Sequence, residues 1–239
     1  MNGPTPTVTL LALTLNEVQG VQAVLPAVDK ALFHQILVVD GGSTDGTVEW
    51  CRANGFDVMV QSQPGIRFAY LEAWPHVTGD VVLTISPDGN CDPAFLAPII
   101  AKMAEGFDMV IGSRYLGDAQ SDDDTWMTGV GNWLFTRTVN VLHGARYTDC
   151  MVIYRAFRRS LIAELDLDKD ASYVLPERLF RTTISWEPLM SVRVAKRRLR
   201  VAEVAAGEPV RIGGKSKLQP FRWGAAYYFQ FWRELWFWR

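Results

Sequence analysis

The feature that most restricts the fold of this sequence is an alternation of short apolar runs with amphipathic stretches over the first half of the chain. The runs predicted to be strands are Val8–Leu13, Ile36–Val39, Val58–Gln61, Val81–Ile85 and Met109–Ile111. The stretches predicted to be helices are Val18–Leu32, a segment through Val48 and Cys51, Arg67–His76 and Ala94–Glu105. Strands that alternate with helices are joined by crossovers, which makes the sheet mostly parallel and covers both of its faces. The sequence therefore predicts an α/β protein.

The second half is less regular. Its predicted helices are Trp126–Leu142, Phe157–Leu165 and Phe221–Arg239, and its predicted strands are Thr148–Tyr154 and Arg193–Val204. Gly207–Lys217, rich in glycine and cations, is predicted to be a loop. Without internal repeats or a low-complexity linker, the chain is expected to form one domain over residues 1–218, followed by a tail at 219–239.

Charge and cysteine content exclude several classes of protein. The 24 lysines and arginines against 26 aspartates and glutamates give a net charge of −2, so no overall basic field would attract nucleic acid. Cys51, Cys91 and Cys150 are odd in number and widely spaced, which fits neither a disulfide framework nor a metal site and favours the cytoplasm. No apolar run of about 18 residues predicts a transmembrane helix, and the N-terminus lacks the features of a signal peptide.

Polar residues follow three of the predicted strands, at the edge where open α/β sheets bind ligands. Asn16 and Glu17 follow the first strand, Asp40 the second and Asp88 the fourth. The Asp40-Gly-Gly-Ser turn would expose a carboxylate beside backbone N–H groups, an arrangement that can bind a nucleoside. The alternative is a glycine turn with a solvated aspartate.

A metal site is predicted after the fourth strand. Asp88, Asn90 and Asp92 alternate, so an extended turn would place their oxygens on one side, as Mg²⁺ or Mn²⁺ requires. The alternative is a polar turn with Asp92 as a helix N-cap, and Asp92 could serve both purposes. No glycine-rich dinucleotide or P-loop motif is present, which argues against dehydrogenases and P-loop NTPases.

Several blocks, in their order along the chain, resemble the family 2 glycosyltransferases, which have the GT-A fold with a Rossmann-like sheet. They are Leu13-Thr-Leu-Asn-Glu17, Val38-Val-Asp-Gly-Gly-Ser-Thr-Asp-Gly-Thr47, Thr78-Gly-Asp-Val-Val82, Ile111-Gly-Ser-Arg-Tyr115, Gly131-Asn-Trp-Leu-Phe-Thr-Arg137, Tyr147-Thr-Asp149 and Arg211–Leu218. The later blocks are similar to the polyprenyl-phosphate branch, which includes the dolichol-phosphate mannose synthases. The resemblance implies an inverting enzyme that uses a nucleotide-diphospho-sugar and a divalent metal.

The resemblance also implies roles for individual residues. Nucleotide binding falls to Asn16, Glu17, Asp40 and Asp88, metal binding to Asp88, Asn90 and Asp92, acceptor and diphosphate binding to Arg114, Arg211, Ser216 and Lys217, and catalysis to Asp88, Asp149, Arg114 and Arg211. Metal and guanidinium groups would stabilise the charge that develops on the leaving diphosphate. A lipid phosphate acceptor is already an anion and needs no strong base, whereas a hydroxyl acceptor would require one, such as Asp149. Arg114 could instead form a structural ion pair.

Two departures from the family pattern bear on these roles. The metal motif carries Asn90 where the family has aspartate, which lowers the charge of the site. The segment before Gly131, basic in the polyprenyl branch, contains Asp118 and Asp122 to Asp124 here, and it would repel a lipid phosphate unless it faces away.

The tail is dense in aromatic residues. On a helical projection Arg222, Gln230, Arg233 and Glu234 fall on one arc and aromatic rings cover most of the rest. Such a helix could lie in a membrane interface with its arginines at the headgroups. It could instead pack on the domain or on a second subunit in a homodimer.

We therefore expect a metal-dependent inverting glycosyltransferase, peripheral at the cytoplasmic face of the membrane. Its donor would be a UDP- or GDP-sugar and its acceptor polyprenyl phosphate or a related lipid-linked molecule. The alternatives are transfer to a soluble or saccharide hydroxyl, a nucleotidyltransferase, and a non-catalytic sugar-nucleotide binder.

Overall fold

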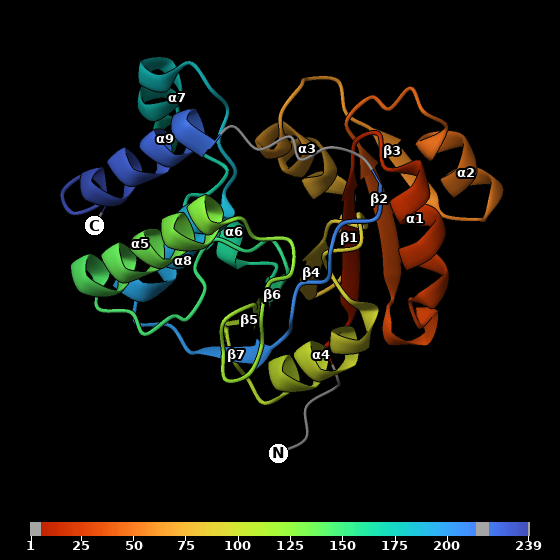
Figure 1. The fold of residues 1–239 in the computed structure, drawn as a ribbon, viewed down its shortest axis with the longest axis horizontal. Helices are drawn as coiled ribbons and strands as arrows, with labels where there is room; N and C mark the ends of the chain where they lie inside the picture. Colours follow the sequence, from red (N-terminus) through yellow and green to blue (C-terminus); the bar gives the residue numbers. More distant parts are fainter. Residues whose placement is uncertain (1–5, 214–219, 239) are drawn as a thin grey trace.

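The computed structural model describes residues 6–213 and 220–238. One seven-stranded sheet runs through it in the order β3-β2-β1-β4-β6-β5-β7 (Figure 1). Its strands are β1 Val8–Thr14, β2 Gln35–Asp40, β3 Asp57–Val60, β4 Val81–Ile85, β5 Met109–Ser113, β6 Arg155–Arg158 and β7 Val201–Ala205. Only β6 runs antiparallel to its neighbours, so the sheet is mostly parallel. The α/β prediction is confirmed.

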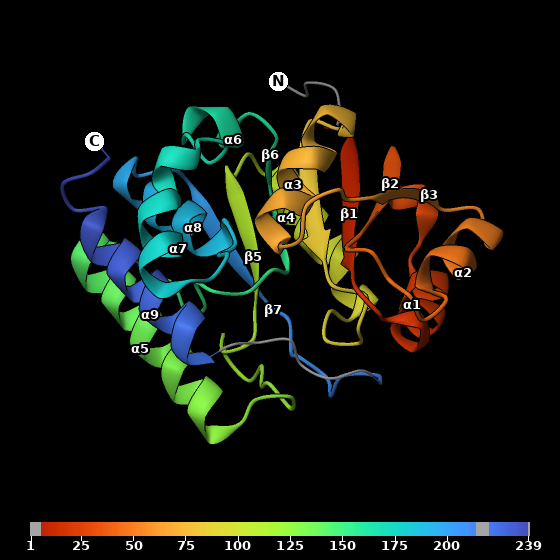
Figure 2. The same cartoon turned by 90° about the horizontal axis from the view of Figure 1, so that it is seen from above.

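Helices cover both faces of the sheet. They are α1 Val18–Val24, α2 Thr47–Ala53, α3 Ile66–Ala73, α4 Leu96–Ala104, α5 Trp126–His143, α6 Leu161–Glu164, α7 Val174–Phe180, α8 Glu187–Lys196 and α9 Pro220–Arg233. Short 3₁₀ turns, η1 to η5, adjoin several of them, among them η4 at Pro93–Phe95. The helices α3 and α4 lie on opposite sides of the sheet (Figures 1 and 2). Every residue of β1 and β4 is buried, as expected for central strands with helices on both sides.

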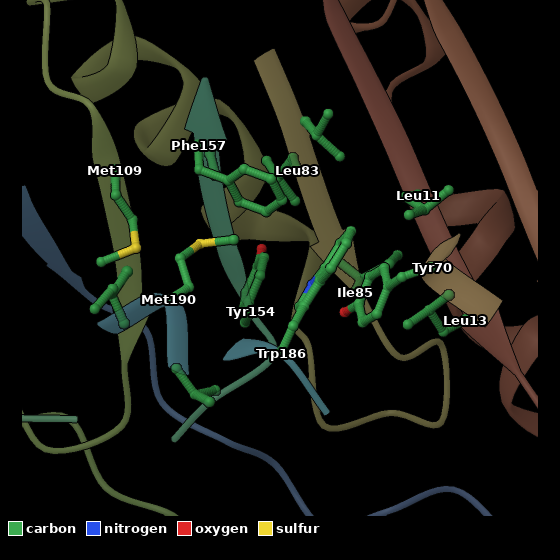
Figure 3. Close-up of a cluster of buried hydrophobic side chains, with 14 of the residues drawn as sticks. Leu11, Leu13, Tyr70, Leu83, Ile85, Met109, Tyr154, Phe157, Trp186 and Met190 are labelled. Carbon is green, nitrogen blue, oxygen red and sulfur yellow. The ribbon is translucent and has the colours of Figure 1, made fainter. Parts of the chain in front are cut away.

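The core joins this sheet to the C-terminal helices. Trp186, directly before α8, is fully buried and stacks on Tyr70 of α3 with the ring centroids 4.2 Å apart. The ring of Trp186 also meets Phe157 of β6 edge-on, at 6.5 Å (Figure 3). The second half of the chain is therefore part of the same core as the parallel strands.

Three expectations for the second half are wrong. Thr148–Tyr154 is a loop, because the buried guanidinium of Arg155 donates to the carbonyls of Cys150 and Val152, so these groups do not join a strand ladder. The strand follows it, at β6, and the helix expected over Phe157–Leu165 is only α6. The strand expected over Arg193–Val204 divides into the end of α8 and β7.

The tail helix α9 has its polar arc on the inside, contrary to expectation. Gln230, Arg233 and Glu234 are buried, and only Arg222 of the predicted arc is exposed. Glu234 forms an ion pair with Arg193 of α8 in which both side chains are wholly inaccessible to solvent. The helix ends at Arg233 and packs against α5, α7 and α8.

Candidate active site

The candidate site lies at the carboxyl ends of β1, β2, β4 and β5. The parallel strands bring Glu17, Asp40, Asp88 and Arg114 to this edge although they lie far apart in sequence. Gly20 of α1 permits the close approach of the Asp88 segment, since a Cβ there would stand 2.3 Å from the carbonyl oxygen of Pro87. The position of Asp88 therefore depends on a glycine in a different element.

The two loops predicted to border the nucleoside hold each other in place. Buried Asp40 accepts hydrogen bonds from the hydroxyls of Thr14 and Ser43 at 2.8 and 2.6 Å and from the N–H groups of Gly42 and Ser43 at 2.9 and 2.7 Å. Exposed Asn16 has a left-handed backbone, with φ at 51°, and its Oδ1 accepts from the N–H of Thr44 at 2.9 Å. Asp40 thus organises the turn, and Asn16 joins it to the end of β1.

The three predicted metal-binding residues differ in their surroundings. Asp88 is buried, and one of its carboxylate oxygens contacts the Nη1 of Arg211. The Nδ2 of Asn90 donates to Asp123 at 2.9 Å and to Glu208 at 3.0 Å, while its Oδ1 is buried with no hydrogen-bond partner. Since both partners of Nδ2 are carboxylates, the amide orientation is chemically determined. Asp92 caps η4 by accepting from the N–H of Ala94 at 2.9 Å, the N-cap role considered above.

Part of the acidic loop lies at the site. Backbone hydrogen bonds of 2.8 and 2.9 Å join Glu208 to Asp122 and to Gln120, so residues 117–125 lie against residues 206–213. Asp123 accepts from Asn90 and from the backbone N–H of Arg211, and Asp124 contacts the hydroxyl of Tyr115. Asp123 therefore adds negative charge to the site, and the Nη2 of Arg211, 3.8 Å from its carboxylate, offsets part of that charge.

Arg114 and Asp149 form the second charged centre. The Nε and Nη2 of Arg114 donate to the two oxygens of Asp149 at 2.6 and 3.2 Å, and its other contacts are Glu208 and Asn132, both at 3.3 Å. Burial alone would raise the pKa of Asp149, but the charge and hydrogen bonds of Arg114 outweigh it and the pKa is lowered. A fully buried carboxylate with both oxygens engaged is poorly suited to take a proton from an acceptor. The two contacts fix the guanidinium group of Arg114 against the buried carboxylate of Asp149.

Three residues that contact the site had no predicted role, and two with a predicted role lie outside the described residues. Glu208 contacts both Asn90 and Arg114, Asp123 contacts Asn90 and Arg211, and Asn132 contacts Arg114. In the sequence, Asp123 stood out only within the acidic segment and Asn132 only within a family block. Ser216 and Lys217 lie outside the described residues. Among the described side chains, carboxylates at this edge outnumber the guanidinium groups of Arg114 and Arg211, so an approaching diphosphate would need additional positive charge.

The oxygen atoms of this site fit a divalent metal whose coordination shell would be completed by substrate oxygens and water. Within residues 6–213 and 220–238, no three His, Cys, Asp or Glu side chains are grouped to hold a metal alone. The buried, unpartnered Oδ1 of Asn90 and the carboxylate of Asp88 are hard oxygen donors two positions apart on one turn. Mg²⁺ commonly takes one or two protein oxygens together with phosphate oxygens and water, which matches this pair.

The sequence model of Glycosyl transferase family 2 matches residues 12–166. This chain belongs to that family. It is a glycosyltransferase, as the resemblance predicted, and the nucleotidyltransferase and non-catalytic alternatives do not hold.

Two relatives of this family 2 glycosyltransferase come from Haloferax volcanii. This chain is 31% identical to glycosyltransferase AglJ, and the match covers 97% of this chain and 73% of that protein. It is 30% identical to a dolichyl-phosphate hexose transferase over 89% of this chain and 87% of that protein. The predicted resemblance to the polyprenyl-phosphate branch is thereby confirmed.

Solved structures confirm the GT-A fold. Glucosyl-3-phosphoglycerate synthase from Mycobacterium tuberculosis, in complex with Mn²⁺, UDP and phosphoglyceric acid, superimposes with a TM-score of 0.70 at 20% identity, covering 96% of this chain and 78% of that one. The same synthase with Mg²⁺ and UDP gives a TM-score of 0.68. In the described part of this glycosyltransferase, no helix combines the length and apolar character needed to cross a membrane.

Proposed function

We propose that this glycosyltransferase moves a hexose, with inversion, from a UDP- or GDP-sugar to polyprenyl phosphate or a related lipid-linked acceptor. The observation that carries the proposal is the placement of two guanidinium groups, Arg211 on Asp88 and Arg114 on Asp149, at the carboxyl edge of the sheet. Arginines in such positions can grip both the leaving diphosphate and an anionic acceptor. The dolichyl-phosphate hexose transferase among the relatives supports an acceptor of this class.

Asp88 and Asn90 would hold a divalent metal, Mg²⁺ or Mn²⁺, which when bound neutralises the diphosphate of the donor. The glucosyl-3-phosphoglycerate synthase structures, which contain Mn²⁺ or Mg²⁺ with UDP, support this cofactor. Arg211 would then exchange its contact with Asp88 for one with the diphosphate. Asn16 and the turn organised by Asp40 would border the nucleoside, and Glu17, which lies 3.8 Å from Arg211, would face the same ligand.

The reaction would be a single displacement. A phosphate oxygen of the acceptor attacks the anomeric carbon, the bond from that carbon to the diphosphate breaks, and the nucleoside diphosphate leaves. Arg114 would hold the acceptor phosphate, with Asp149 fixing the direction of its guanidinium group. An anionic acceptor loses no proton, so the engagement of Asp149 is no obstacle. Transfer to a hydroxyl would require a base, and this observation disfavours that alternative.

The enzyme would work peripherally at the inner face of the membrane, where a lipid acceptor resides. The test is a screen of UDP- and GDP-hexoses with Mn²⁺ and a short-chain polyprenyl phosphate in detergent, followed by extraction of sugar into the organic phase. We expect one donor to give an acid-labile lipid product. Transfer to a sugar or glycerate acceptor, with no lipid product from any donor, would contradict the proposal.

A further inference from the structure

Helix α5 exposes large apolar side chains that an ordinary surface helix would bury. Its exposed stripe carries Trp126 and Trp133, 84% and 65% exposed, together with Val130 and Val141 at helical spacing. Its buried residues are Asn132, Thr136, Thr138 and Val139, of which three are polar. Surface helices normally place the apolar stripe against the core, whereas the apolar stripe of α5 faces away from it.

The neighbouring helices also expose large apolar side chains. In α9 and the turn after it, Phe221 and Trp236 are 80% and 63% exposed while Gln230 and Glu234 are buried. Helix α9 lies between α5 and α7 and contacts both (Figures 1 and 2). We define the outer helical face as the exposed apolar residues of these three helices and of the turn after α9: Trp126, Met127, Val130, Trp133, Leu134, Val141, Val174, Leu175, Leu179, Phe221, Trp232, Leu235, Trp236 and Phe237.

The exposed charges that α5, α9 and the α7 segment carry have one sign, and the exposed Asp122 lies outside these helices, in the loop that leads into α5. Arg137 continues the exposed stripe of α5, Arg178 and Arg181 follow Val174 at helical spacing, and Arg222 adjoins Phe221. The sequences of α5 and α9 contain no aspartate or glutamate. The one acid of α7, Glu177, is engaged by Arg67. The outer helical face is therefore apolar and cationic.

This combination selects an anionic lipid surface over a second copy of the chain. Tryptophan is favoured at the headgroup level, and arginines beside apolar rings attract anionic lipid. A second copy seated symmetrically would bring the same arginines toward one another without facing carboxylates.

The face also adjoins the candidate site. Asn132, whose Oδ1 accepts from Arg114, lies on the buried side of α5, six residues from Trp126, or about 9 Å along the helix. The loop that carries Asp123 leads directly into the first turn of α5. An acceptor phosphate could therefore reach Arg114 while its hydrocarbon chain stays in the bilayer.

We propose that the outer helical face is a membrane-docking surface, lying in the interface of an anionic bilayer with the α5 end next to the acceptor site. This deepens the proposed function, which supplies the lipid acceptor. It replaces the predicted tail anchor with a surface to which three helices contribute.

The test is flotation of the full chain with phosphatidylcholine vesicles, with and without phosphatidylglycerol. We expect binding only with the anionic lipid, and the double variant Trp126→Ser/Trp133→Ser to weaken it about tenfold or more. Arg137→Gln/Arg178→Gln should weaken it and flatten its dependence on salt. Val60→Ser, at an exposed apolar position on β3 at the opposite edge of the sheet, is the control and should bind as wild type.

Two outcomes would overturn the docking surface. One is a full chain that does not float with anionic vesicles. The other is a stable dimer, seen by sedimentation, that dissociates in Trp126→Ser/Trp133→Ser, which would assign the face to a second copy. Neither outcome bears on transfer to short-chain polyprenyl phosphate in detergent, so the proposed function is tested separately.

Discussion

Arg114 holds both carboxylate oxygens of Asp149 from outside the core, at 2.6 and 3.2 Å, while Asp149 has no exposed surface. The pair thus fixes the direction of one guanidinium group at the edge of the sheet. Its Nη1 also donates to Glu208 and its Nη2 to Asn132, so a change at Asp149 affects the whole cluster.

Replacing Asp149 separates a positioning role from a basic one. Asp149→Asn should reduce kcat by about tenfold to a hundredfold, because Arg114 loses its charged anchor, and should leave the acidic limb of the pH–rate profile in place. Asn132→Ala, which removes a neutral contact of Arg114, is the matched control and should have a smaller effect. Loss of the acidic limb in Asp149→Asn would restore Asp149 as the base.

The same pair makes stability depend on pH. Because the folded pKa of Asp149 lies below its ordinary value of about 3.9, its contribution to the free energy of unfolding is complete above that pH and is lost as pH falls through the folded pKa. Breaking a buried pair costs about 3–5 kcal/mol, so urea denaturation at pH 7 should show Asp149→Asn destabilised by that order. The difference from wild type should shrink below about pH 4. An unchanged difference between pH 7 and pH 3 would contradict the ion-pair explanation.

The contact of Arg211 with Asp88 leads to opposite effects on metal and on turnover. Arg211→Ala removes the cation that neutralises Asp88, so Mn²⁺ should bind the donor-free protein more tightly in a calorimetric titration. Donor turnover should fall about a hundredfold, because a group that stabilises the leaving diphosphate is lost. Asp88→Asn is the comparison, and should weaken Mn²⁺ binding. Weaker Mn²⁺ binding in Arg211→Ala would mean that Arg211 does not compete with the metal.

The parts of the fold that follow local rules could be predicted from sequence. The strands that end at Asp40 and Asp88 are short apolar runs closed by polar turns, and the parallel arrangement then places both residues at one edge. Their partners could not be predicted, since Asp123 and Glu208 reach Asn90 from loops 33 and 118 residues further along the chain.

Several of the misassigned elements share a physical cause, which is burial of charged groups. Helix α8 is buried on all sides from Glu187 to Val194, with Arg193 inaccessible, so it lacks the amphipathic period by which a helix is recognised. The polar arc of α9 was predicted to lie at a surface, and this was wrong for the same reason, because Glu234 pairs with Arg193 inside the protein. Charged residues normally indicate a surface, and here they connect one helix to another.

The contacts of Asn90 explain why an amide stands where the family has aspartate. Its amide donates to two carboxylates, so Asn90→Asp would set a third negative charge against Asp123 and Glu208. We expect the metal-free protein to lose about 1–3 kcal/mol of stability and Mn²⁺ to restore it, which differs from the simple improvement in metal binding that charge alone suggests. Thermal unfolding with and without Mn²⁺ measures both effects, and Asn90→Ser, which loses the amide without adding charge, is the control. Equal stability of Asn90→Asp and wild type without metal would contradict the assigned contacts.

The docked tail can be tested through Glu234. Its oxygens accept from the Nε and Nη2 of Arg193 at 2.9 and 3.1 Å, and neither side chain is accessible to solvent. Glu234→Gln leaves a buried guanidinium group without its counter-charge, although Arg193 keeps its bonds to the carbonyl of Leu165 and the hydroxyl of Ser172, so we expect a loss of about 3–5 kcal/mol in urea denaturation. Arg222→Gln, an exposed change on α9 itself, should stay within about 0.5 kcal/mol of wild type. If both variants unfold like the wild type, α9 is not an integral part of the domain, and a tail that detaches at a membrane would become the better description.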